Sequence, residues 1–169
     1  MQKLPTRTKK LLDTKEKVCA AAVYYLNRRF YTCFELKTKL RKRGAEARHI
    51  EGALAELAER GWLDEEKLAE AHIHHRSANC LRGPFCVRQE LLNRGLNHEL
   101  TESSLARWYD RDAEREVIDL FLDKELRHAP FDLTDKKALD KLRRKLANRG
   151  FSLFLINERL QFLKNVDKC

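Results

Sequence analysis

The sequence predicts an all-α fold made of three tandem three-helix repeats in an elongated array. Three observations predict it. One segment returns three times along the chain, apolar residues recur at helical spacing nearly throughout, and six Gly and three Pro leave little room for the turns of a sheet. No stretch shows the alternation of apolar and polar residues that is typical of strands.

The repeated segment reads ELKTKLRKRG at 35–44, CVRQELLNRG at 86–95 and KLRRKLANRG at 141–150. Each copy ends in Arg-Gly, and the glycine suits the left-handed end of a helix. Apolar residues lie one helical turn apart before the glycine, and further matched positions follow it at plus six and plus ten. The matched positions are Leu36, Val87 and Leu142; Leu40, Leu91 and Leu146; Ile50, Thr101 and Ile156; and Leu54, Leu105 and Leu160. A period of about 50 residues is long enough for three short helices.

Composition supports an array with much surface. Of the 169 residues, 43% are hydrophobic and 36% are charged. A repeat of this size buries little apolar area alone and must pack on its neighbours. The formal net charge of +9 favours an acidic partner such as nucleic acid. Because residues 64–112 hold more acidic than basic side chains, the excess charge lies toward both ends of the chain.

The sequence also indicates a compartment. Its five cysteines are an odd number without a CxxC pair, which favours a reducing environment. No apolar run approaches the roughly 20 residues of a membrane helix, and the N-terminus lacks the apolar core of a signal peptide. We therefore expect a cytoplasmic protein without a membrane partner. The cysteines give no guidance on oligomeric state, for which our expectation is a monomer.

We expect residues 1–13 to form a basic flexible arm and residues 14–63 to form the first repeat. Its first helix covers 14–29, with Val18, Ala22 and Tyr25 on one apolar stripe. Thr32 and Glu35 form a capping box for a second helix that ends at Gly44. A third helix begins near 45–48 and ends at Gly61.

The second repeat is predicted over residues 64–112. Trp62 and Leu63 are expected to insert into a core, and Asp64 caps a helix over 65–81. Pro84 then begins a helix that runs to Gly95, because proline is tolerated at a helix start. A third helix carries Leu105, Trp108 and Tyr109.

The third repeat is predicted over residues 113–169. Its first helix covers 113–127, and Leu120 belongs to a broad apolar face. After a break, Thr134 caps a helix that ends at Gly150. A final helix follows, with Phe154 and Leu160 among its apolar residues.

No constellation predicts catalysis. His72, His74 and His75 form the one dense histidine group, but their spacing matches no common zinc pattern, so we interpret them as helix positions. The three repeat glycines end helices rather than precede them, which is the wrong geometry for a phosphate loop. We therefore expect neither an enzyme nor a cofactor.

Basic side chains are the candidate binding residues. Lys141, Lys145 and Arg149 follow each other at intervals of four and predict one cationic stripe. An arginine near a helix C-terminus also interacts favourably with the helix dipole, so that role stays open for Arg149 and its counterparts. The full set for filament or DNA binding is Arg28, Arg29, Lys37, Lys39, Arg41, Lys42, Arg43, Arg82, Arg88, Arg94, Lys141, Arg144, Lys145 and Arg149.

Four segments together resemble the RecX family of bacterial recombination regulators, over roughly residues 18–164. They are TCFELKTKLRKRG at 32–44, GWLDEEKLAE at 61–70, RGPFCVRQELLNRG at 82–95 and KLRRKLANRGF at 141–151. Each segment alone is weakly specific, but all four in this order are specific. Departures from the family pattern are Trp62, Glu65 and Val87, and the HIHH run at 72–75 replaces a more arginine-rich helix.

The resemblance implies a long, curved, basic molecule of three-helix repeats. It also implies binding to the filament that RecA forms on single-stranded DNA, within DNA repair and the SOS response. There the protein would limit filament growth and inhibit ATP hydrolysis, strand exchange and coprotease activity. The alternatives are a helix-turn-helix-like transcription regulator and a helical scaffold without a nucleic-acid role.

Overall fold

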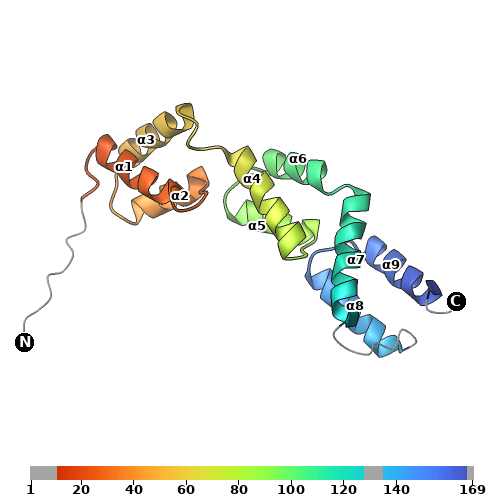
Figure 1. The fold of residues 1–169 in the computed structure, drawn as a ribbon. Helices are drawn as coiled ribbons and strands as arrows, with labels where there is room; N and C mark the ends of the chain where they lie inside the picture. The colour runs from red at the N-terminus through yellow and green to blue at the C-terminus, as the bar shows by residue number, and fades with distance from the viewer. Residues whose placement is uncertain (1–10, 128–134, 167–169) are drawn as a thin grey trace, which may run out of the picture. The chain divides into compact units, whose positions relative to one another are not determined.

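The computed structural model describes residues 11–127 and 135–166, and this part of the chain is helical without strands (Figure 1). The helices are α1 (Lys15–Leu26), α2 (Cys33–Arg41), α3 (Ala47–Glu59), α4 (Glu65–His74), α5 (Pro84–Asn93), α6 (His98–Trp108), α7 (Arg111–Arg127), α8 (Lys136–Asn148) and α9 (Leu153–Val166). The all-α prediction is confirmed. Over the described ranges, no helix combines the length and apolar character needed to cross a membrane.

The repeated positions serve the same purpose in each copy. Gly44, Gly95 and Gly150 all adopt left-handed backbone conformations, with φ of 85°, 86° and 87°. The side chains at the twelve matched positions are buried, each 5% exposed or less. The periodic core predicted from the sequence is therefore confirmed at the level of single side chains.

The described residues fall into two compact units, one up to Leu68 and the other from Ala69 onward. The boundaries predicted for three separate repeats thus stay a prediction. In the first unit, α1 packs on α3, and α2 contacts both (Figure 1). Leu12 is buried in this core although it was assigned to the flexible arm, and residues 1–10 of that arm lie outside the described residues.

Polar side chains cap the starts of α2 and α4 as predicted. The Thr32 hydroxyl accepts from the Glu35 amide at 3.0 Å, and the Glu35 carboxylate accepts from the Thr32 amide at 3.1 Å. Asp64 caps α4 by accepting from the Lys67 amide at 2.9 Å. The prediction for Trp62 is wrong, because its ring is 44% exposed. Its amide closes the turn after Gly61 by donating to the Leu57 carbonyl, and the ring stays on the surface.

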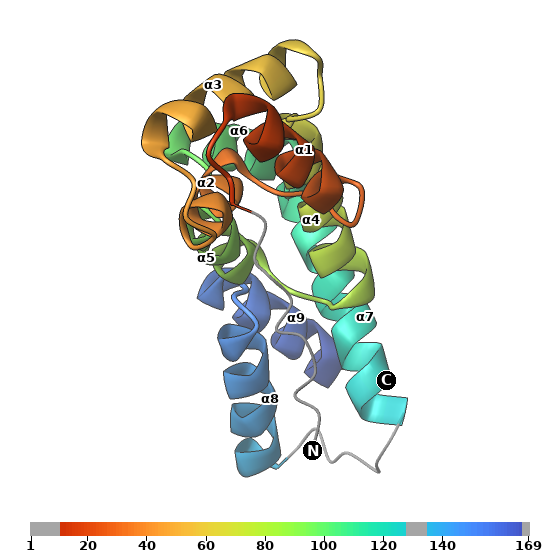
Figure 2. The same cartoon turned by 90° about the vertical axis from the view of Figure 1, so that its left-hand side faces the viewer.

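In the second unit, α9 packs against both α7 and α8 (Figure 2). Their shared core includes Ile118, Phe121, Leu142, Leu146, Leu155 and Ile156. Leu120 and Phe154, both predicted to be apolar contacts, are instead 55% and 64% exposed. The predicted cap Thr134 lies outside the described residues, and Asp135 caps α8 by accepting from the Lys137 amide at 2.9 Å.

The helix predicted over 65–81 is interrupted. It is α-helical only to His74, and a π-helical turn follows over His75–Asn79. The Trp108 indole donates to the Ser77 hydroxyl at 2.9 Å, and the Tyr109 hydroxyl donates to the Arg82 carbonyl. These bonds tie the irregular turn to the end of α6.

The C-terminal end of α8 meets the N-terminal end of α5. The Gly83 amide donates to the Arg149 carbonyl at 2.8 Å, and the Phe85 amide donates to the Gly150 carbonyl at 3.0 Å. No side chain caps α5, so carbonyls at the end of α8 satisfy amides that a cap would otherwise bind. The approach is close, since a Cβ on Gly83 would lie 2.4 Å from the Gly150 carbonyl carbon. We call this contact the α5–α8 joint.

Candidate nucleic-acid interface

Three tyrosines at the end of α1 and in the loop before α2 form a connected group. The ring centroids of Tyr24 and Tyr25 are 5.8 Å apart, and those of Tyr25 and Tyr31 are 5.9 Å apart. The Thr32 capping box fixes the end of this loop against α2. Tyr24 is exposed, whereas Tyr25 packs against the core of the first unit and Tyr31 is part of it, so the sequence YYLNRRFY at 24–31 links one open ring to two enclosed ones.

Cations cover these rings. The Arg28 guanidinium lies 4.7 Å from the Tyr24 centroid, the Arg29 guanidinium lies 3.9 Å from the Tyr31 centroid, and the Lys39 ammonium lies 4.9 Å from the Tyr25 centroid. Arg43 donates to the Tyr25 hydroxyl at 3.3 Å. We call the three tyrosines with Arg28, Arg29, Lys39 and Arg43 the tyrosine–cation cluster. Four of the fourteen predicted binding residues meet here.

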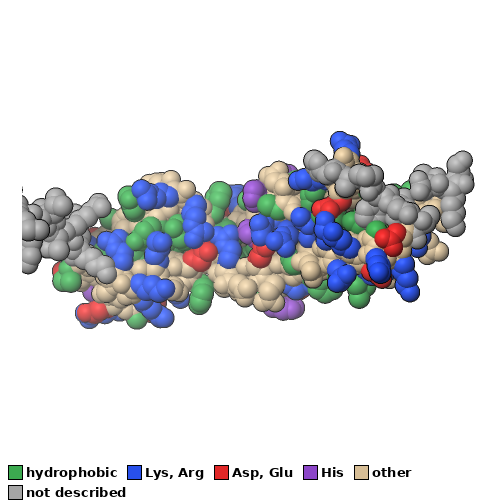
Figure 3. Space-filling model, turned by 90° about the horizontal axis from the view of Figure 1, so that it is seen from below, with side chains coloured by type: hydrophobic (Ala, Val, Ile, Leu, Met, Phe, Trp, Pro, Cys, Tyr) green, Lys and Arg blue, Asp and Glu red, His purple; other side chains and the backbone are tan. Residues whose placement is uncertain are grey.

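The charge of the cluster acts on its tyrosines. A hydrogen bond from Arg29 is the main reason why the pKa of the Tyr31 phenol lies below its ordinary value. The Arg29 guanidinium also lies 3.6 Å from the Glu35 carboxylate, so that acid is partly neutralised. On the face drawn in Figure 3, lysines and arginines are interleaved with hydrophobic side chains over the first unit (left).

A groove opens beside the cluster. It has a volume of about 280 Å³ and is lined by Arg29, Tyr31, Phe34, Glu35, Thr38, Lys39 and Lys42. We call it the α2 groove, because five of these residues belong to α2 or its C-terminal cap. Phe34 is 55% exposed. Of the remaining predicted residues on this helix, Arg41 is exposed and Lys37 is half-buried.

Two tyrosines of the cluster, Tyr24 and Tyr31, and Phe34 of the α2 groove were not among the predicted binding residues. A signal was present, since four aromatics and two arginines occur within the eight residues 24–31. The prediction that Tyr25 belongs to an apolar stripe is confirmed, since its ring packs against the core, and of the loop that follows only Arg28 and Arg29 were predicted to bind. Aromatic side chains interleaved with cations are the combination that single-stranded nucleic acids bind, through base stacking and phosphate contacts.

Several predicted residues of the second unit hold the protein together. Arg88 forms two hydrogen bonds with the Glu102 carboxylate, at 2.5 and 2.9 Å. Arg149 donates to the carbonyls of Cys80 and Leu81 at 2.8 and 3.2 Å, next to the α5–α8 joint. Lys145 is paired with Glu125.

The predicted stripe of Lys141, Lys145 and Arg149 is therefore not a continuous cationic surface, because two of its members bind groups of the protein itself. Lys141 and Arg144 are exposed on α8, and the Arg144 side chain donates to the Asp140 carbonyl at 3.4 Å. Arg82 and Arg94 are half-buried. A binding role for these residues of the second unit stays a prediction.

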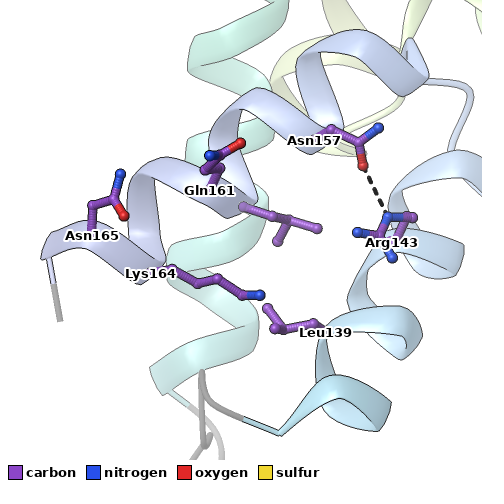
Figure 4. A pocket seen from close by; sticks show the side chains of 7 residues that line it. Leu139, Arg143, Asn157, Gln161, Lys164 and Asn165 are labelled. Atoms are coloured by element: carbon purple, nitrogen blue, oxygen red, sulfur yellow. Dashed lines mark hydrogen bonds between the residues drawn. The ribbon is translucent and has the colours of Figure 1, made fainter. Parts of the chain in front are cut away.

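A second hollow, of about 550 Å³, lies between α8 and α9 (Figure 4). Its lining is Leu139, Arg143, Asn157, Leu160, Gln161, Lys164 and Asn165. The Arg143 side chain donates to the Asn157 amide oxygen at 2.9 Å and is also paired with Asp140. The ion pair with Asp140 offsets the charge of the arginine that lines the hollow.

His72 and His75 have polar partners within the protein rather than a shared ligand, and the His74 ring contacts the edge or face of Trp108 in a T-shaped arrangement. His72 lies 2.9 Å from the Glu90 carboxylate, which also binds Arg76. Burial is the main cause that lowers the pKa of His72. His75 lies 3.0 Å from the Asn79 amide. Within residues 11–127 and 135–166, no group of three or more potential metal ligands is found.

Comparison with known proteins decides the family. The chain is 35% identical over 150 residues to the regulatory protein RecX of Pseudomonas fluorescens strain SBW25, covering 89% of this chain and 94% of the relative. This chain belongs to the RecX family. The RecX of Pseudomonas entomophila strain L48 is 37% identical with the same coverage. Residues 20–57 match the family described as RecX, first three-helix domain. That match contains all of the tyrosine–cation cluster and the α2 groove.

RecX proteins differ in length. The RecX of Oceanobacillus iheyensis is 24% identical over 88% of this chain, but the chain spans only 54% of that relative. The crystal structure of RecX from Lactobacillus salivarius matches with a TM-score of 0.79 and 21% identity, covering 89% of this chain and 96% of that one. At this identity the likeness shows the fold, a RecX arrangement of helices.

Proposed function

We propose that this chain binds the filament that RecA forms on single-stranded DNA and limits its growth, thereby inhibiting ATP hydrolysis, strand exchange and coprotease activity. It does so by binding rather than by catalysis, without a cofactor, as a monomer in the cytoplasm. Membership of a family of regulatory proteins supports the class of function.

The observation that carries the proposal is the tyrosine–cation cluster. Cations held over aromatic rings are pre-positioned, so less side-chain entropy is lost when they contact a phosphate. Arg41 and Lys42 extend the same positive surface along α2 and are exposed. Together these groups present a surface suited to the sugar–phosphate backbone of the DNA within the filament.

The test compares two triple variants that remove equal charge from the first unit. The first variant changes Lys37, Arg41 and Lys42 to Gln. The control variant changes Arg48, Arg60 and Lys67 to Gln, which lie outside both the cluster and α2 on the same unit, with side chains 64–77% exposed. RecA-catalysed ATP hydrolysis on single-stranded DNA is measured against the concentration of each variant.

We expect the first variant to inhibit more weakly and the control to inhibit like the unchanged protein. The log–log salt dependence of binding should also flatten, by about 0.7 for each lost phosphate contact. Charge reversal of Lys37, Lys39 and Arg43 to Glu should weaken inhibition further, because Lys39 and Arg43 also hold the tyrosines. Equal inhibition by all variants would refute the role of this surface.

The helix-turn-helix alternative predicts a different result. A transcription regulator would bind a specific duplex sequence and leave the RecA ATPase unchanged. A scaffold without a nucleic-acid role would affect neither measurement.

A further inference from the structure

The α2 groove has the size and lining of a site for one flat ring. Its volume of about 280 Å³ is at the small end of ligand-binding pockets. Tyr31 forms one part of the lining and is itself covered by Arg29, whereas Phe34 presents a largely exposed ring. An exposed aromatic ring beside a hollow gains free energy when another flat ring stacks on it.

The charges around the groove favour an anionic ligand. Three cations, Arg29, Lys39 and Lys42, contribute to its lining against one carboxylate, Glu35. That carboxylate accepts the Thr32 amide at 3.1 Å and faces Arg29, so its charge is largely used within the protein. Lys39 and Lys42 are one helical turn apart on α2 and thus lie on the same side of the groove.

A flat ring joined to an anion is the chemistry of a nucleotide. Stacked duplex bases present no free ring face, and the groove is too small for a base pair, so an unpaired base is the form that fits. Stacking tolerates any base, because every base has a π-face. The groove lining does not require a base-specific pattern of donors and acceptors.

We propose that the α2 groove binds one unpaired nucleotide of a single strand, its base stacked on Phe34 and its flanking phosphates beside Lys39 and Lys42. This inference rests on the proposed function, because it names the part of the filament that the α2 groove contacts, a single nucleotide of the DNA strand. It adds that the bases, and not only the phosphates, contribute to binding.

The experiment measures binding of the full chain alone to two fluorescently labelled 15-mers of equal charge, one of thymidines and one of abasic residues. Base stacking of 1–3 kcal/mol corresponds to about 5- to 150-fold tighter binding of the thymidine strand. Phe34→Leu keeps an apolar side chain but removes the π-face. It should abolish the preference for thymidine and leave the affinity for the abasic strand and its salt dependence unchanged.

Two further variants serve as controls. Phe34→Trp keeps an aromatic face and should retain the preference. Phe162→Leu removes an exposed ring, 51% accessible, from α9 of the second unit and should change nothing. A strand that carries 2-aminopurine gives a direct readout, because its fluorescence should be quenched on binding and less so with Phe34→Leu.

Equal affinity for both strands, or a Phe34→Leu variant that keeps the preference, would overturn the inference. It would also be overturned if polyglutamate of equal charge bound as tightly as the thymidine strand and Phe34→Leu weakened both alike, since the groove would then recognise an acidic protein segment. If the protein inhibits RecA but shows no thymidine preference, the proposed function holds and the base-stacking inference fails. If it prefers thymidine but does not inhibit RecA, the base-stacking inference holds and the proposed function fails.

Discussion

Gly83→Ala tests the α5–α8 joint, because the glycine is required there by the closeness of two backbones. Its backbone is extended, with φ of −83°, so alanine adopts the same conformation without strain. The added Cβ, however, would lie 2.4 Å from both the carbonyl carbon and the carbonyl oxygen of Gly150, where ordinary contact begins at 3.4 Å. The two helix ends must therefore separate by about 1 Å.

Two hydrogen bonds cross the joint, and their donor–acceptor distances are 2.8 and 3.0 Å. A separation of about 1 Å makes both distances too long for a hydrogen bond. Each buried partner left unsatisfied costs about 1–3 kcal/mol, so we expect Gly83→Ala to lower the free energy of unfolding by about 2–5 kcal/mol. Urea unfolding followed by circular dichroism measures the loss. Hydrogen exchange should in addition accelerate at the Gly83 and Phe85 amides.

Gly52→Ala is the matched control. Gly52 lies within α3, where a Cβ would be 3.4 Å from the Lys15 side chain and meets no backbone of another element. Alanine is favoured over glycine inside a helix, so this variant should gain about 0.5–1 kcal/mol. If Gly83→Ala unfolds within about 0.5 kcal/mol of the unchanged protein, the closeness of the joint, and our reasoning from it, is refuted.

Three further predictions follow from single side chains. Arg149→Gln should lower the free energy of unfolding by about 2–4 kcal/mol, because two hydrogen bonds of a charged donor are lost. It should leave the salt dependence of DNA binding unchanged. A flatter salt dependence in filter binding would assign Arg149 to the interface instead. Leu40→Ala and Leu146→Ala should each cost about 2–5 kcal/mol in thermal or urea unfolding, and unmoved transitions would contradict their burial. The pKa of His72 is lower in the folded state than in the unfolded state, so the free energy of unfolding should fall as the pH drops below about 6.5. His72→Gln should make the free energy of unfolding, measured in urea, less dependent on pH between 7 and 5.

The core was predictable because it depends on local periodicity. Leu36, Leu40 and their counterparts recur at helical spacing before a glycine, and this spacing places them on one buried face whatever the rest of the chain does. The Thr32–Glu35 capping box was predictable for the same reason, since its partners are three residues apart.

Partners distant in sequence were not predictable. Arg43 and Arg149 occupy the same position of the repeat, yet Arg43 binds the Tyr25 hydroxyl and Arg149 binds carbonyls 68 and 69 residues away. The pattern of charges gives no sign of this difference. Trp62 and Phe154 were misassigned because an apolar residue type was taken as evidence of burial, although folded surfaces contain many apolar atoms.

The α5–α8 joint also bears on how the molecule can be taken apart. A fragment that stops before α7 would retain α5 but lose the carbonyls that satisfy its first turn, and the amides of Gly83 and Phe85 would have to turn to water. Deleting the C-terminal helices thus damages what remains, and a loss of activity in such a truncation would not locate the activity in the deleted segment. Point substitutions are therefore better suited than truncations to identify which helices of this chain contribute to its activity.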